Sequence, residues 1–378
     1  MSTSTAEPET DVYAELAPVE VNWRDRQQYL ESRGYMLRRR YHPDWQPSWR
    51  SNPSIRARHA EDSLSTHMLR SSLMDATRIA DGTLVLLKRI GAKSTELSIA
   101  NQLSSPEYRS DPRNHCVPIL DVIPDADDPK MSYIVMPFLR YVDDPEFRSV
   151  DNIFDCVDQL LEVFCLPSSV YGESLMSASK GLVFLHDNGI AHRDCAYKNL
   201  MMDATRLFPD GFHPMRLDCQ PQNITRAATL LSRNDVPVTY YYVDFGISTW
   251  LRPEDTDRLV VGSDGLDQDV PELSDDVLYD PFKVDIFVLG NFFRQNFTQK
   301  YSNLDILEPL VSQMTRRDPA RRPTAANALQ QWNSLRLSVW TIKRFWRPRP
   351  RGEPLVVKAF SDVFSLLYLV YRFLRLPQ

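Results

Sequence analysis

The chain has 378 residues, which is enough for one large or two ordinary domains. Hydrophobic residues make up 43% and charged residues 25%, a composition that is typical of a globular protein and excludes a wholly disordered one. The net charge of −6 provides no general attraction to nucleic acid, and five cysteines without metal-ligand spacing indicate a reducing compartment. Since we find neither an apolar signal region nor a stretch that could span a bilayer, we expect a soluble protein of the cytoplasm or nucleus.

The first two segments differ in composition. Residues 1–21 are rich in Ser, Thr, Glu and Pro, which predicts a disordered N-terminus. Residues 22–64 interleave aromatic side chains with arginines, an arrangement also found where nucleic-acid bases stack on proteins. We favour the alternative, a lead segment that packs its aromatic side chains on the following domain, because the chain is acidic and has no RNA-binding motif. We therefore expect no nucleic-acid partner.

Short apolar runs predict a β-rich region from residue 65 onward. Residues 83–88 form an apolar run that ends in Lys88, and since side chains alternate along a strand, Leu86 points to the same face as this lysine. Glu96 opens a helical stretch that continues to residue 103. Residues 118–121 and 133–139 are predicted to form two further strands.

Two motifs carry the most information. Residues 192–194 read H-R-D and are followed, after four residues, by Asn199, while residues 244–246 read D-F-G. Phosphoryl transfer needs a carboxylate that accepts the proton of the attacking hydroxyl, and oxygen ligands that hold Mg²⁺ on the phosphates. Asp194 can supply the first, and Asn199 with Asp244 can supply the second.

On these motifs, the chain resembles the eukaryotic protein kinases over roughly residues 65–335, and in detail it is similar to a divergent fungal branch of them. The resemblance implies an α+β, bilobal kinase fold, with a small β-rich N-lobe at residues 65–136 and a mainly helical C-lobe at residues 140–335. It also implies binding of ATP and Mg²⁺ and a protein substrate, with Ser or Thr favoured over Tyr as the acceptor.

The resemblance further assigns roles to single residues. By position, Lys88 matches the lysine that holds the α- and β-phosphates, and Glu96 matches the glutamate that pairs with it. Met136 matches the gatekeeper, and Phe138 belongs to the hinge that contacts the adenine. Asp194 matches the catalytic base, Asn199 a metal ligand and Asp244 the principal Mg²⁺ ligand.

Three more positions concern the substrate class. Asp285 matches the aspartate that anchors the catalytic loop. Glu272 is the last residue of a Val-Pro-Glu segment, which stands where the family has Ala-Pro-Glu. Arg322 matches the arginine that pairs with this glutamate. Small-molecule phosphotransferases share the catalytic motif but lack this segment and its distant arginine. The resemblance therefore favours a protein substrate.

The nucleotide site departs from the family pattern in two ways. No glycine occurs between Gly34 and Gly82, so residues 69–75 cannot form a Gly-rich loop, which predicts weaker or differently organised phosphate binding. The alternative is that serines and a different turn cover the nucleotide. Leu86 stands where the family usually has alanine above the adenine. Either the adenine binds farther from this strand than in the family, or the leucine side chain partly fills the adenine pocket.

The catalytic loop also departs from the pattern. Ala196 stands where Ser/Thr kinases carry lysine, and Lys198 resembles the position where tyrosine kinases carry arginine. A cation there can neutralise charge on the transferred phosphoryl group, whereas the alternative is a solvated loop lysine. We favour the catalytic role, and acceptor specificity stays open.

Three segments lie outside the motifs. The turn-rich insert at residues 204–239 predicts a loop projecting from the back of the C-lobe, with a structural role for His213. The interval from Asp285 to Arg322 is short, so the helix that commonly docks substrates is missing. The activation segment, residues 244–272, is acidic, and we hypothesise that one of its carboxylates pairs with Arg193 in place of a phosphate.

The C-terminal region, residues 336–378, combines a basic linker with an amphipathic helix whose apolar face runs from Val356 to Leu374. Such a helix after a basic stretch fits an anionic membrane surface. The alternative, which we favour, is a helix that docks on the C-lobe or on a partner.

Two functions therefore fit the sequence. One is an active protein kinase, favoured because all the ionisable groups that the chemistry needs are present together. The other is a pseudokinase scaffold that binds partner proteins, supported by Leu86, the absent Gly-rich loop and the missing docking helix.

Overall fold

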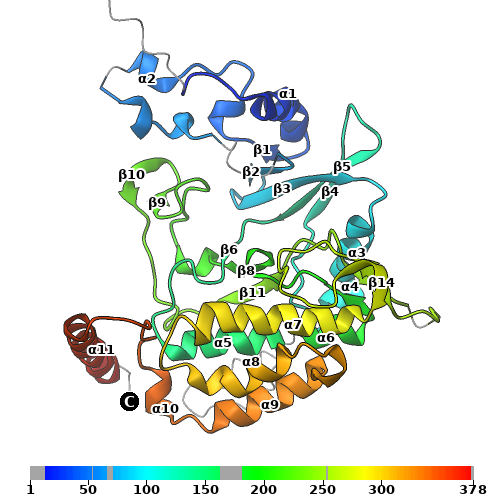
Figure 1. Cartoon of the computed structure of the whole chain (residues 1–378). Coiled ribbons are helices and arrows are strands. Elements are labelled where there is room, and N and C mark those ends of the chain that lie inside the picture. The colour runs from blue at the N-terminus through cyan, green and yellow to red at the C-terminus, as the bar shows by residue number, and fades with distance from the viewer. Residues whose placement is uncertain (1–12, 53, 66–70, 162–180, 253, 376–378) are drawn as a thin grey trace, which may run out of the picture. The chain divides into compact units, whose positions relative to one another are not determined.

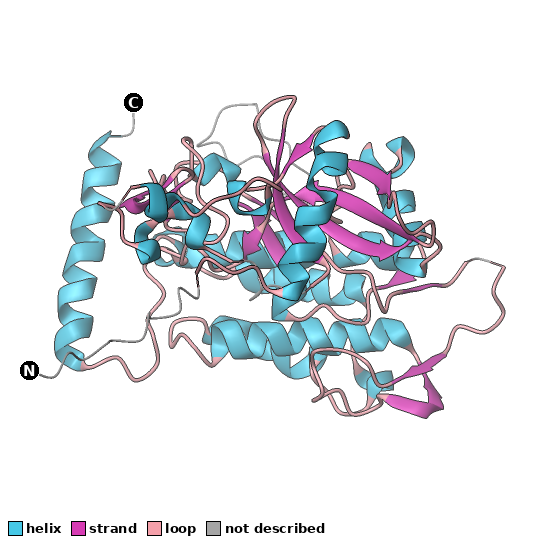
Figure 2. Cartoon of the chain, turned by 90° about the horizontal axis from the view of Figure 1, so that it is seen from above, coloured by secondary structure: helices cyan, strands magenta, loops and turns pink. Residues whose placement is uncertain are grey.

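The structure, a computed structural model, describes residues 13–52, 54–65, 71–161, 181–252 and 254–375. It is an α+β protein with helices and strands in both halves of the chain (Figures 1 and 2). The chain divides into two compact units. Unit 1 contains the described residues up to Leu97 together with Ile119–Phe138 and Leu207–Leu231, and unit 2 contains Ser98–Pro118, Leu139–Arg206 and the described residues from Ser232 onward.

Unit 1 is built on a five-stranded antiparallel sheet in the order β1-β2-β3-β5-β4. The strands are β1 (Tyr35–Met36), β2 (Leu73–Arg78), β3 (Leu84–Gly91), β4 (Asp121–Pro124) and β5 (Met131–Pro137). The strand predicted at residues 83–88 is confirmed as β3, the one predicted at 133–139 ends already at Pro137, and the one predicted at 118–121 begins only at Asp121. Along β3, Val85 and Leu87 are buried in the core and Leu86 shares the opposite face with Lys88, as the alternation of side chains predicted.

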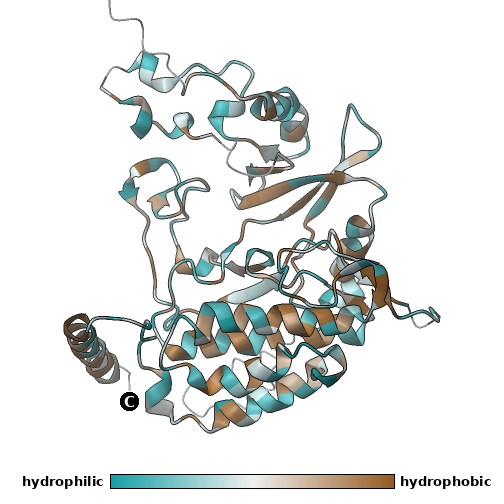
Figure 3. Ribbon diagram, in the orientation of Figure 1, coloured by the Kyte–Doolittle hydropathy of each residue, from teal (hydrophilic) through white to brown (hydrophobic). Residues whose placement is uncertain are grey.

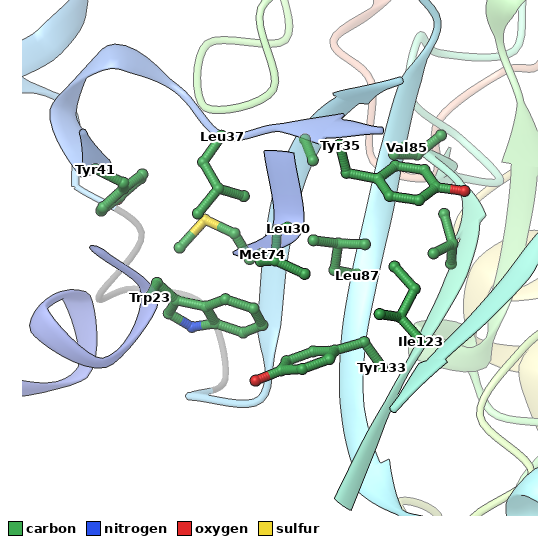
Figure 4. Close-up of a cluster of buried hydrophobic side chains, with 12 residues drawn as sticks. Trp23, Leu30, Tyr35, Leu37, Tyr41, Met74, Val85, Leu87, Ile123 and Tyr133 are labelled. Carbon is green, nitrogen blue, oxygen red and sulfur yellow. The ribbon is translucent and has the colours of Figure 1, made fainter. Parts of the chain in front are cut away.

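The lead segment belongs to this sheet. Its elements are α1 (Pro18–Ser32), α2 (Ser48–Ser51) and the 3₁₀ turns Arg39–Tyr41, Ala57–His59 and Glu61–Ser63. Trp23, Tyr35 and Tyr41 are buried in one cluster with Leu87 and Tyr133 of the sheet (Figure 4), so the predicted packing of the aromatic side chains is confirmed. Because β1 pairs with β2, the predicted boundary between residues 64 and 65 does not separate two structural parts.

The predicted disordered segment, residues 1–21, is too long. Residues 1–12 lie outside the described part of the chain, but α1 already begins at Pro18 and Glu20 is buried. Glu20 accepts hydrogen bonds from Arg40 (2.8 Å to Nε) and from the hydroxyl of Tyr41 (3.0 Å). A carboxylate that pairs with a buried arginine stabilises order in a stretch whose composition alone predicts none.

Unit 2 is mainly helical. Its helices are α4 (Pro106–Arg109), α5 (Val150–Leu161), α6 (Leu182–Asp187), α7 (Pro281–Phe293), α8 (Glu308–Met314), α9 (Ala325–Leu337), α10 (Thr341–Arg344) and α11 (Leu355–Arg375), and α3 (Thr95–Ser104) begins in unit 1 and continues into it. Trp332 of α9 is fully buried, packs edge-on against Phe154 of α5 and donates a hydrogen bond of 2.6 Å to Asp158. These contacts join α5 to α9 and form the core of the helical part.

Short strands in unit 2 support the loops that carry the motifs. β6 (Arg140–Tyr141), β8 (Leu200–Asp203) and β11 (Thr239–Tyr242) form a three-stranded sheet. β7 (Ile190–Ala191) pairs with β12 (Thr249–Trp250), and β13 (Val260–Gly262) pairs with β14 (Ser274–Tyr279). After α7, a π-helical turn (Arg294–Thr298) and a 3₁₀ turn (Asp305–Leu307) lead directly to α8, which agrees with the short interval noted in the sequence.

The insert differs from its prediction. It contains a hairpin, β9 (Cys219–Gln220) and β10 (Asn223–Ala227), and Leu207–Leu231 belong to unit 1 instead of projecting from the helical unit. Buried His213 accepts hydrogen bonds at Nδ1 from two backbone amides, so Nε2 carries the proton and donates to Glu61 at 3.1 Å. The structural role predicted for His213 is thus confirmed, but the lead segment supplies its partner.

The C-terminal region begins later than predicted, because α9 continues to Leu337. The linker contains α10 and is followed by α11, so the predicted C-terminal helix is confirmed. Within the part of the chain that the structure describes, we find no helix that combines the length and the apolarity needed to cross a bilayer. Four cysteines, Cys116, Cys156, Cys195 and Cys219, are buried free thiols, and Cys165 lies outside the described residues.

Candidate functional site

Lys88 and Glu96 form an ion pair in unit 1, as predicted. The lysine Nζ lies 2.5 Å from Oε1 of the glutamate, and the two side chains are 14% and 12% exposed. The lysine stands on β3 and the glutamate in the first turn of α3, where a negative charge also interacts favourably with the helix dipole. The pair holds the ammonium group in one position at the edge of the solvent, where it can meet a phosphate.

The residues predicted to surround the adenine lie next to each other in the sheet. Leu86 on β3 is directly opposite Met136 on β5, and Met136 is buried. Phe138, which follows β5, packs against Phe212 of the insert with ring centroids 5.9 Å apart. An aromatic side chain from a distant segment therefore contacts the predicted hinge at Phe138. The predicted phosphate-covering segment, residues 69–75, is described only from Ser71 onward, because residues 66–70 lie outside the described part.

Asp285 of α7 anchors the loop that carries the H-R-D motif, as predicted. Its carboxylate accepts hydrogen bonds from the backbone amides of His192 (2.9 Å) and Arg193 (2.5 Å), and His186 contacts the same group at 2.9 Å. Asp285 is fully buried, so the loop backbone is fastened to the rigid core of unit 2. Arg193 has a φ of 66°, a strained conformation for a non-glycine residue that these bonds help to maintain.

Asp194 and Asn199 are in direct contact. Nδ2 of Asn199 donates to Oδ2 of Asp194 at 2.7 Å and to its backbone carbonyl at 3.1 Å. The second carboxylate oxygen, Oδ1, accepts a hydrogen bond of 2.8 Å from the backbone amide of Leu266. Burial raises the pKa of Asp194 above its ordinary value and the charge of Asp244 adds to the increase, although the bonds from Leu266 and Asn199 act in the opposite direction.

The D-F-G segment lies beside the same loop. The backbone amide of Val243 donates to the carbonyl of Asn199 at 3.0 Å, and the ring of Phe245 is 4.9 Å from that of His192. Asp244 is half-buried and has a φ of 63°, the second non-glycine residue with a positive φ in the described chain. Strained backbone of this kind is concentrated at functional sites. The structure therefore joins the two motifs into one constellation within unit 2.

Asn199 and Asp244 provide oxygen atoms suited to Mg²⁺. Because Asn199 uses its amide nitrogen for Asp194, its carbonyl oxygen is directed away from that carboxylate. An amide oxygen with a carboxylate is the hard oxygen donor set that this ion prefers, with water and phosphate oxygens completing the shell. Among the described residues, we find no group of three or more His, Cys, Asp or Glu side chains that could hold a metal without such help.

Lys198 lies on the 3₁₀ turn Tyr197–Asn199 and is exposed. The structure therefore presents its ammonium group to solvent, next to Asn199, on the loop that holds Asp194. Both interpretations from the sequence, a catalytic cation and a solvated loop lysine, remain consistent with this position.

The hypothesis that a carboxylate of the activation segment pairs with Arg193 is wrong for this structure. The guanidinium donates to the hydroxyl of Tyr279 (2.6 Å) and to the carbonyls of Val261 (3.0 Å) and Ile247 (3.2 Å). The ring of Tyr279 also lies under the guanidinium, which is 5.7 Å from its centroid. Carbonyls and a phenol accept from the two terminal nitrogens, while the buried Nε of Arg193 has no hydrogen-bond partner in the described part of the chain.

Glu272 and Arg322 pair as predicted. Nη2 of Arg322 donates to Oε2 of Glu272 at 2.8 Å, and Nη1 bonds the other carboxylate oxygen, so the contact is bidentate. The arginine side chain is fully buried and also donates to backbone carbonyls of Lys283 and Arg316. The end of the activation segment is thereby fixed to α7 and to the loop before α9.

Contacts between distant segments that were not predicted from the sequence include Leu266 with Asp194, Tyr279 with Arg193, and Phe212 with Phe138. The Leu266 contact uses a backbone amide, which carries no signature in the residue type. The aromatic residues of the insert are a signal that could have located Phe212, because large apolar side chains are seldom left exposed on a loop that projects into solvent.

Comparison with protein-family models and curated proteins finds no relative of this chain. No protein-family model matches the chain, and no curated protein sequence is detectably similar to it. The functional assignment therefore depends on the residues and on their geometry.

Proposed function

We propose that this chain is a protein kinase that transfers the γ-phosphoryl group of ATP to a hydroxyl group of a protein. The observation that carries the proposal is the arrangement of Asp194 and Asn199 on a loop whose backbone is anchored by Asp285. The H-R-D and D-F-G motifs, far apart in sequence, meet in this arrangement through Val243 and Phe245. An α+β architecture agrees with the bilobal kinase fold that we propose for the chain.

Each ionisable group has a role in the proposed reaction. Asp194 orients the acceptor hydroxyl and takes its proton through whichever carboxylate oxygen faces the substrate. Lys88, held by Glu96, binds phosphate oxygens of ATP. Lys198 stabilises the negative charge that develops on the transferred group, because its ammonium group extends from the same loop. Asn199 and Asp244 would hold Mg²⁺, which neutralises phosphate charge when it is bound.

The bidentate pair of Glu272 with Arg322 supports a protein acceptor over a small molecule. It gives the activation segment a fixed end, and β13 within the segment pairs with β14, which directly follows it. A fixed segment of this length offers surface for a polypeptide.

A second candidate function is a pseudokinase scaffold that binds partner proteins with weak or no catalysis. Three observations favour it: Leu86 shares a face with Lys88, Phe212 covers Phe138, and the amide of Leu266 engages Asp194. The first two would leave less room for an adenine bound beside the sheet, and the third gives one oxygen of the base a donor within the protein. The scaffold would use the same fold without turnover.

Nucleotide binding separates the two candidates first. We would measure the melting temperature of the wild-type chain with and without ATP and Mg²⁺, beside Asp244→Ala and a control, Asp210→Asn, in the exposed part of the insert. Ligand at about a hundred times its dissociation constant should stabilise the fold by roughly 2.7 kcal/mol. A kinase predicts a metal-dependent increase that is lost in Asp244→Ala and retained in the control. If millimolar nucleotide gives no increase in melting temperature, the pseudokinase scaffold is the remaining candidate.

Transfer itself needs a second measurement, because a scaffold can still bind nucleotide. Incorporation of labelled phosphate into a mixture of proteins should be lost in Asp194→Asn, while the ATP-dependent increase in melting temperature persists. Equal incorporation by wild type and Asp194→Asn would refute the role of Asp194 as base.

A further inference from the structure

Helix α11 presents an apolar face to solvent. Along this face five residues are spaced alternately by four and three positions, Phe364 lies beside them, and each of the six is between 49% and 68% exposed. They are Val356, Phe360, Val363, Phe364, Leu367 and Val370. Figure 3 shows the apolar colouring of this helix. Together these side chains expose on the order of 600 Å² of apolar surface, the upper end of what monomeric proteins leave uncovered.

The orientation of the helix explains why this face is exposed. Asp362 is bound by Arg347 and Arg349, each at 2.8 Å, and Leu369, seven residues later on the same side of the helix, is buried. The linker that carries these arginines is itself fastened to unit 2, since the backbone of Ser302 donates to the carbonyl of Arg349 at 2.8 Å. The polar side of α11 is thus turned toward its own unit, and the apolar side faces outward.

We propose that this face pairs with the same face of a second copy of the chain. Spacing that alternates between three and four residues is the pattern by which helices pack side chains into each other along a shared seam. The face carries no charged side chain from Val356 to Val370, so it imposes no complementary charge pattern on a partner. Such a surface is self-complementary, as a two-fold symmetric contact requires.

The available area also agrees with self-association. A standard interface buries about 800 Å² on each partner, and the face of α11 supplies most of this amount before any neighbouring residue is counted. Because the salt bridges to Asp362 hold the helix on unit 2, both copies would meet with the helix already ordered. Little conformational entropy is then lost on association.

A membrane surface is a weaker match for this region. Its attraction to anionic lipid depends on free basic side chains. Each of the four arginines from 344 to 351 is instead paired with a carboxylate of the same chain, the partners being Asp151, Glu353, Asp362 and Asp305. The net charge of the whole chain is also negative.

The test uses the full-length chain and two matched variants. Leu367→Glu places a charge at the centre of the face, and Leu355→Glu places the same charge at the start of the helix, away from the face, where the leucine is 82% exposed. Light scattering and sedimentation velocity over a range of concentrations should show wild type and Leu355→Glu as dimers and Leu367→Glu as a monomer. Since Leu367 is exposed in the single chain, its melting temperature as a monomer should not fall.

A wild-type chain that stays monomeric at all concentrations overturns the proposal without any variant. A dimer that persists in Leu367→Glu overturns it as well, because the contact must then lie elsewhere. Sedimentation with vesicles of phosphatidylcholine and phosphatidylserine provides the remaining outcome. If a monomeric wild type binds these vesicles and Leu367→Glu does not, the face belongs to a membrane surface and pairing is refuted.

Discussion

The backbone amide of Leu266 donates a hydrogen bond of 2.8 Å to Oδ1 of Asp194. Because Asn199 bonds the other carboxylate oxygen at 2.7 Å, both oxygens of the proposed base have a donor within the protein. The activation segment therefore contacts the group whose basicity the proposed chemistry requires. Each carboxylate oxygen still has a second lone pair that can accept from the hydroxyl of a substrate.

The pH dependence of phosphoryl transfer tests the environment of Asp194. A general base acts only when it is ionised, and burial together with the charge of Asp244 raises the pKa of this carboxyl. We expect activity to fall on acidification at a higher pH than an ordinary aspartate would give. A profile of kcat/KM against pH measures this, and an acidic limb at or below the ordinary aspartate pKa would contradict the expectation.

Substitution of Leu266 separates the backbone contact from the side chain. Leu266→Pro removes the N–H that lowers the pKa of Asp194, so the acidic limb should move to still higher pH. Leu266→Ala keeps the amide and should leave the profile where it is in wild type. If both variants shift the profile equally, the leucine side chain and not the hydrogen bond sets the basicity.

Arg322 is expected to be essential for stability. Arg322→Met would leave Glu272, which is mostly buried, without its partner, and loss of one member of such a pair costs about 3–5 kcal/mol. Arg321→Met is the control, because Arg321 is the exposed neighbour. Chemical denaturation measures both, and we expect less than about 0.5 kcal/mol for the control. Similar losses in the two variants would show that the bidentate pair contributes little.

Leu86 should limit nucleotide affinity. Leu86→Ala removes three carbon atoms from the face that also carries Lys88, so the dissociation constant for ATP should fall by about two- to tenfold, equivalent to up to about 1.4 kcal/mol. Leu120→Ala, at another partly exposed leucine of unit 1, serves as the control and should bind as wild type does. Calorimetric titration measures the affinities. Weaker binding by Leu86→Ala would mean that the leucine contacts the adenine favourably.

The pair of Glu20 and Arg40 should stabilise unit 1. Glu20→Gln leaves a buried guanidinium without its counter-charge, at a cost of about 3–5 kcal/mol at neutral pH. Asp25→Asn removes the exposed pair with Arg24 from the same helix and should cost less than about 1 kcal/mol. The two free energies of unfolding come from urea titrations. If both substitutions lower the free energy of unfolding equally, the pair of Glu20 and Arg40 is not a main source of stability.

The same pair predicts a pH dependence. Burial favours the neutral form of Glu20, but the hydrogen bonds from Arg40 and from the backbone of Ala17 prevail and lower its pKa from 4.5 to about 2. A lowered pKa in the folded state contributes stability above pH 4.5 and loses it as the pH falls toward 2. The difference in unfolding free energy between wild type and Glu20→Gln should therefore shrink in this range. A constant difference would contradict the assignment.

Relationships within one short stretch could be predicted in part from the sequence. Leu86 shares a face with Lys88 because side chains alternate along a strand, and Asp194 and Asn199 were recognised as motif residues, but the hydrogen bond between them was not predicted. The distant pair of Glu272 with Arg322 could also be predicted, since the resemblance to the kinases supplied both positions. The shared face of Leu86 and Lys88 came from the residues alone, whereas the pair of Glu272 and Arg322 came from the resemblance.

Contacts formed by backbone groups or by packing could not be predicted in this way. The amide of Leu266 is 72 residues from Asp194 in the chain, and His213 is 152 residues from Glu61. The sequence by itself determined the proposed catalytic residues, several of the helices and strands that carry them, and the apolar face of α11. Only the tertiary structure decided which segment engages Asp194, that the insert packs with the lead segment, and that α11 faces outward. These outcomes depend on how distant surfaces compete for burial and for hydrogen-bond partners, which no local pattern of residues encodes.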